Sequence, residues 1–170
     1  MKWMALVSLL LVFPLASVAA PAQVSHQDKT WLKAANQVNL EEMQSGALAQ
    51  QKGNTDSVRS TGQTLASDHQ NLDAQLKPVA QQLGVSLPTE PTSKARRQMK
   101  KLQGKQGAAF DTAYVQDEIK GHKQAIAKTK KEIDHGSSMQ VKQLAQQCLP
   151  VLEKHLQMLQ HDADAMHGST

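Results

Sequence analysis

The sequence contains a single cysteine, Cys148, so no internal disulfide can form, and the fold must depend on its core or on a bound metal. Aromatic residues are also scarce, at 3% of the chain, and runs of β-branched residues are absent. Alanine, glutamine, leucine and lysine predominate instead, which is typical of a helical protein. The formal net charge of +4 is small and dispersed, which argues against a nucleic-acid partner.

Long apolar runs are absent after the N-terminus, where Met4–Phe13 is apolar except for Ser8. Lys2 precedes this run, and Ala20-Pro21-Ala22 supplies the small residues of a cleavage site, so residues 1–22 are predicted to be a signal peptide. The run is too short to remain as a membrane anchor. We therefore expect export, to the periplasm of a Gram-negative cell and otherwise to the cell surface or medium.

Apolar residues at spacings of three and four predict four long helices, over residues 30–52, 55–83, 108–134 and 137–165. Short turns make the first two helices one antiparallel pair and the last two another. The crossover between the pairs contains a short basic helix at residues 93–102. This order predicts an all-α, ferritin-like four-helix bundle at residues 30–165, with disordered segments at 23–29 and 166–170. Pro78 and Pro150 are expected to kink their helices, or at Pro150 to interrupt the helix.

Three of the long helices place a histidine where the apolar seam would otherwise continue, and the first helix places a glutamate in the middle of its stripe. These residues are Glu42, His69, His122 and His155. Counted from the two turns, they lie at matching heights to within about 6 Å. Three imidazoles and a carboxylate suit Zn, Fe, Mn or Cu, so we predict one transition-metal site. Asp68 and Glu118 are further candidate ligands.

The function of such a site is not fixed by these residues. A di-iron centre needs Glu-x-x-His on two helices, which the sequence does not supply, and no phosphate-binding loop or hydrolase motif is present, so an enzymatic activity is not favoured. One hypothesis is metal handling or envelope stress defence. The alternative is a metal-free structural or interaction protein of the envelope, whose polar core fixes helix register. The basic crossover helix also predicts weak contact with an anionic envelope surface, through Arg96, Arg97, Lys100 and Lys101.

Five short segments, in this order and spacing, are NLEEMQSGALA (39–49), SDH (67–69), LGVSLP (83–88), GAAFDTAYV (107–115) and CLPVLEKHL (148–156). Together they resemble the secreted bacterial proteins grouped as domain of unknown function 4142, often named predicted outer membrane proteins. The resemblance covers residues 31–159 and implies a ferritin-like bundle, while implying little about activity. The matching positions are Glu42, Asp68, His69, Phe110, Asp111, Tyr114, His122, Pro150 and His155. The sequence departs at Gly121, where the family tends to place aspartate.

Overall fold

A computed structural model describes residues 24–168 of the protein, and this part of the chain forms five helices and no strand. The predicted signal peptide, residues 1–22, lies outside the described residues. None of the helices between residues 24 and 168 is long and apolar enough to cross a membrane.

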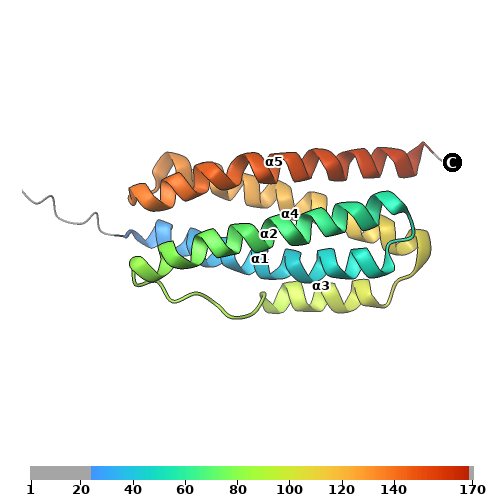
Figure 1. Ribbon diagram of the computed structural model, residues 1–170, viewed down its shortest axis with the longest axis horizontal. Helices are drawn as coiled ribbons and strands as arrows, with labels where there is room; N and C mark the ends of the chain where they lie inside the picture. Colours follow the sequence, from blue (N-terminus) through green and yellow to red (C-terminus); the bar gives the residue numbers. More distant parts are fainter. Residues whose placement is uncertain (1–23, 169–170) are drawn as a thin grey trace, which may run out of the picture.

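Four long helices run side by side along the molecule (Figure 1): α1 (His26–Lys52), α2 (Asp56–Gln82), α4 (Gly107–His135) and α5 (Met139–His167). The closest packing is within two hairpins, α1 with α2 and α4 with α5. α1 also packs against α4 and α2 against α5, so the four helices enclose a common core. The connection between the hairpins carries α3 (Ser93–Gln103), which lies against α1 and α4 on the outside of the bundle. The predicted all-α helical bundle is therefore confirmed.

The ends of the bundle differ from the sequence prediction. α1 begins at His26 because Ser25 and Asp28 form a capping box, in which each side chain accepts a hydrogen bond from the backbone N–H of the other. The expected disorder at 23–29 is therefore wrong from His26 onward, and α5 extends through His167 into the expected disordered tail. The predicted interruption at Pro150 is also wrong, because α5 is continuous through it.

Two buried aspartates tie each hairpin to the turn of the other. Asp28, in the first turn of α1, accepts hydrogen bonds from the backbone N–H groups of the two residues that precede α5, at 3.0 and 3.2 Å. Asp111, at the start of α4, accepts hydrogen bonds from the backbone N–H groups of the two residues that precede α2, at 2.8 and 3.0 Å. These bonds satisfy backbone N–H groups that a helix N-terminus leaves unpaired. The helix dipole also favours a negative charge at this end of a helix.

α1 and α2 come into backbone contact where two glycines face each other. A Cβ atom at Gly46 would lie 2.4 Å from the carbonyl oxygen of Gly62. A Cβ atom at Gly62 would lie 2.6 Å from the Cβ atom of Ala49. No side chain larger than hydrogen fits at these positions without moving a helix. This contact lies one helical turn from Glu42 and therefore helps to set the spacing of the helices around the polar core.

A further carboxyl group, Glu132, is fully buried beside Asp28 at the end of α4. Burial, together with the nearby charge of Asp28, raises the pKa of Glu132 to about 7. A carboxyl group that binds its proton more tightly in the folded chain stabilises the fold below its ordinary pKa of 4.5. This contribution is lost as the pH rises through about 7.

Replacing this carboxyl group with a neutral amide should remove that pH dependence. We expect Glu132→Gln to match the parent protein near pH 4 and to exceed its stability at pH 8 by up to about 3 kcal/mol. Thermal unfolding of both proteins from pH 4 to pH 9 measures the difference, with Asp134→Asn, an exposed neighbour, as the control. A Glu132→Gln variant with the parent's pH profile would contradict this explanation.

Candidate metal centre

Three histidines from three different helices meet in the centre of the bundle. His69 on α2, His122 on α4 and His155 on α5 are at most 1% exposed. Their ring centroids lie 5.3 to 5.7 Å apart, and one ring nitrogen from each lies within 4.8 Å of the other two. The sequence prediction that these three side chains lie at one height is therefore confirmed.

Each ring directs one nitrogen outward to an oxygen atom. Nδ1 of His69 lies 2.9 Å from Oδ1 of Asn39, and Nδ1 of His122 lies 3.0 Å from the backbone carbonyl oxygen of Glu118. Nε2 of His155 lies 2.9 Å from a carboxylate oxygen of Asp68. Because these oxygens are acceptors, the outward nitrogen of each neutral ring carries the hydrogen. Such outer bonds fix the tautomer and the orientation of metal-binding histidines.

The inward nitrogens consequently all present lone pairs to the same small volume. They are Nε2 of His69, Nε2 of His122 and Nδ1 of His155. Nε2 of His122 lies 3.4 Å from Nδ1 of His155, while Nε2 of His69 is buried and has no hydrogen-bond partner among the described residues. A tetrahedral metal with M–N bonds of about 2.0–2.1 Å holds its nitrogen ligands about 3.4 Å apart. The spacing of the His122 and His155 nitrogens matches that requirement.

All three rings are held in their neutral, metal-binding form. Burial, with smaller contributions from His122 and His155, lowers the pKa of His69 well below its ordinary value. Burial also lowers the pKa of His122 to about 4. The same effect lowers the pKa of His155, although the hydrogen bond and charge of Asp68 offset part of it. No ring has to lose a proton before it binds a metal at neutral pH.

Glu42, the fourth predicted ligand, lies on the other side of His122. One of its carboxyl oxygens is 3.7 Å from Nδ1 of that ring, which is the outward nitrogen. Glu42, Glu118 and His122 form a second group whose potential ligand atoms lie within 4.8 Å of one another. The structure therefore divides the predicted ligands into a three-histidine cluster and a separate carboxylate cluster that share His122.

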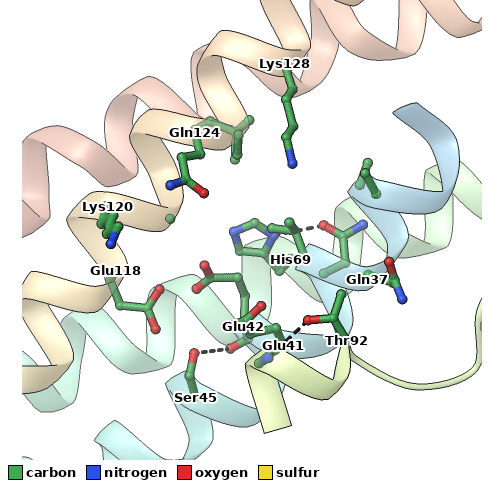
Figure 2. A pocket seen from close by; sticks show the side chains of 18 of the residues that line it. Gln37, Glu41, Glu42, Ser45, His69, Thr92, Glu118, Lys120, Gln124 and Lys128 are labelled. Atoms are coloured by element: carbon green, nitrogen blue, oxygen red, sulfur yellow. Dashed lines mark hydrogen bonds between the residues drawn. The ribbon is translucent and has the colours of Figure 1, made fainter. Parts of the chain in front are cut away.

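The two carboxyl groups of the second cluster face each other from α1 and α4 (Figure 2). Burial, followed by the charge of Glu118, raises the pKa of Glu42 well above its ordinary value. Burial likewise raises the pKa of Glu118, although hydrogen bonds with Glu42 and Ser45 offset part of the effect. Both carboxyl groups therefore bind a proton more tightly than an exposed glutamate does.

A cavity of about 310 Å³ leads from the surface to both clusters. It lies between α1, α3 and α4, and Figure 2 shows Glu42 and Glu118 at its wall with His69 behind them. Lys94, Lys120 and Lys128 also line it, whereas His122 and His155 do not. His69 and the carboxyl pair are therefore among the buried polar groups that a solute in the cavity meets.

The hydrogen-bond partners of the rings were only partly foreseeable. Asp68, a candidate ligand by sequence, instead supports His155 from outside the cluster. Asn39 was not predicted; its place on the same helical stripe as Glu42 was the available signal. The family's aspartate before His122 is absent at Gly121, but the Glu118 carbonyl already accepts the outward hydrogen of His122.

Other polar features lie apart from the centre. One Glu-x-x-His spacing does occur, from Glu132 to His135, but it lies at the end of α4 and His135 is exposed. Cys148 is a buried core residue whose pKa is raised to about 12 by burial, so it is not a reactive thiolate. Arg96, Arg97, Lys100 and Lys101 of α3 are exposed, with Arg96 bound to Glu90, and their contact with an anionic surface stays a prediction.

These observations define the class of protein as an all-α helical bundle with a buried histidine cluster. The model of the family described as a domain of unknown function, DUF4142, matches residues 13–161, and the chain belongs to this family. A DUF305 fragment from Deinococcus radiodurans has a similar crystal structure, with a TM-score of 0.72, 18% identity, and coverage of 84% of this chain and 97% of that chain. This similarity shows the fold alone. No match was found among curated proteins.

Proposed function

We propose that this protein binds one transition-metal ion through Nε2 of His69, Nε2 of His122 and Nδ1 of His155. The single observation that supports this most strongly is the convergence of three buried lone pairs, each fixed by an outward hydrogen bond. Lone pairs at this spacing repel one another unless a cation or a proton lies between them. Three neutral nitrogens suit Zn, Cu or Fe and leave a further coordination position open.

The cellular role that we propose is metal handling or stress defence in the cell envelope. The apolar leader before residue 23 supports export, and the long connection between two antiparallel hairpins supports a ferritin-like bundle. The closed protein surroundings of the three rings favour retention of an ion over rapid turnover of a substrate. The proposed role in metal handling depends on the metal site, and the proposed location in the envelope depends on the apolar leader.

The alternative is a metal-free polar core that fixes the register of the helices. It requires at least one ring to turn its N–H into the cluster, for example from Nε2 of His122 to Nδ1 of His155 across 3.4 Å. That tautomer would leave Nδ1 of His122 without its hydrogen beside the Glu118 carbonyl oxygen, 3.0 Å away. Two acceptors, Nδ1 and the carbonyl oxygen, would then face each other without a hydrogen between them. The free-energy cost of this arrangement favours the metal-bound form over the metal-free core.

The test is a metal titration of protein purified without an affinity tag and stripped with a chelator. We expect one equivalent of Zn²⁺ or Cu²⁺ to bind, with Cu²⁺ the tighter of the two. Elemental analysis and isothermal titration calorimetry measure the stoichiometry and affinity. Less than about a tenth of an equivalent, with no rise in unfolding temperature at saturation, would contradict the proposal and favour the metal-free core.

A further inference from the structure

The carboxyl pair at the cavity wall has a polar atom that the protein itself does not satisfy. Oε2 of Glu42 is buried and accepts no hydrogen bond from the described residues, although the side chain is only 3% exposed. Glu118, at 7% exposed, faces it from α4 (Figure 2). Burying an unpaired carboxylate oxygen is costly, so this arrangement calls for a bound partner at the cavity wall.

The neighbouring atoms favour a cation as that partner. Two ionised carboxylates carry two negative charges, and one divalent ion neutralises both. The two carboxyl groups and a nitrogen of His122 already lie within 4.8 Å of one another, so the carboxyl groups are close enough for one ion to contact both. Nδ1 of His122 is 3.7 Å from a carboxyl oxygen of Glu42, but it keeps its hydrogen bond to the Glu118 carbonyl oxygen, so the two carboxyl groups supply the protein ligands.

We propose that Glu42 and Glu118 form a second divalent-cation site at the wall of the cavity, beside His122 and distinct from the three-histidine centre. Its oxygen-rich ligand set favours harder ions, such as Mn²⁺, than the three nitrogens do. The cavity gives this site direct access from the surface and leaves room for water ligands on the ion. The protein thus offers two kinds of metal site on either side of His122.

The experiment is a Mn²⁺ titration of the metal-free protein, followed by the loss of the electron paramagnetic resonance signal of free Mn²⁺. We expect the parent protein to bind one Mn²⁺, Glu42→Gln to weaken this binding at least about tenfold, and His69→Ala to retain it. Glu118→Gln should repeat the effect of Glu42→Gln. Glu153→Gln, which removes a half-exposed carboxylate paired with Lys130, is the matched control.

The variants separate this site from the three-histidine centre. Both glutamine variants keep the shape of the side chain and remove a buried charge, and circular dichroism with thermal unfolding verifies that they fold. Absence of Mn²⁺ binding in the parent protein, unchanged binding in Glu42→Gln, or loss of binding in His69→Ala would each overturn the proposal. Zn²⁺ binding by the histidines is measured separately, so failure of one site is distinguishable from failure of the other.

Discussion

Replacing any one of the three cluster histidines with alanine is expected to weaken Zn²⁺ binding by more than about a hundredfold, because losing even an outer partner of a ligand costs about 10–100-fold. Two imidazoles cannot complete a tetrahedral site without two outside ligands. Calorimetric titration of His69→Ala, His122→Ala and His155→Ala measures this loss. The control is His161→Ala, which removes an exposed imidazole from the same helix as His155.

The same variants should lose the stabilisation that the metal provides. At a free Zn²⁺ concentration about 1,000 times the Kd, bound metal adds about 4 kcal/mol to the folded state. For a chain of this size the gain corresponds to a rise of about 8–16 °C in unfolding temperature. At a hundredfold weaker affinity the three alanine variants should keep at most about a third of this rise, whereas His161→Ala should show all of it. Equal metal-induced shifts in the alanine variants and the parent protein would place the metal elsewhere.

The second large effect is expected where α1 and α2 touch. Gly46→Ala places a methyl group 2.4 Å from a backbone oxygen of the neighbouring helix, so the helices must separate. We expect this overpacking to cost about 2 kcal/mol, which lowers the unfolding temperature by about 4–8 °C. Gly62→Ala should behave alike, because its methyl group meets Ala49 and the Gly46 carbonyl oxygen.

Gly121→Ala is expected to raise the stability of the protein, in contrast to Gly46→Ala. A Cβ atom at this helical position meets nothing within 4 Å, so only the greater helix propensity of alanine remains. We expect a gain of about 0.5–1 kcal/mol. Chemical denaturation of the parent and the three variants measures these differences. If Gly46→Ala and Gly121→Ala changed stability in the same direction, close packing at Gly46 would not be the reason for its glycine.

The helices and the histidine cluster were predictable because both follow from periodicity. His69 and His155 occupy positions at which a leucine would continue the seam, and each is fully buried in the structure. The Ser25–Asp28 capping box could also have been recognised from the sequence. It explains why the predicted start of α1 was several residues too late. Patterns within one helix were thus reliable guides.

What the sequence did not reveal depends on contacts between helices. The prediction treated Glu42 and His122 as partners around one ion, whereas the ring presents Nδ1 to the carboxylate and Nε2 to His155. Helical spacing fixes which face a residue occupies, but it cannot say which ring nitrogen faces which neighbour. The cavity under α3 was likewise invisible, because it depends on how the connection packs over α1 and α4.

The two aspartates that join the hairpins have a kinetic consequence. Swinging one hairpin away from the other exposes the N–H groups at the starts of both α2 and α5, because each hairpin supplies the other's acceptors. Opening of the bundle at either end therefore breaks the hydrogen bonds of one aspartate, which raises the free-energy cost of that local opening. An ion held by the three histidines, which lie on both hairpins, then exchanges with solvent through the cavity or at the rate of global unfolding. We therefore expect the topology, together with the ligands, to slow the release of the proposed ion.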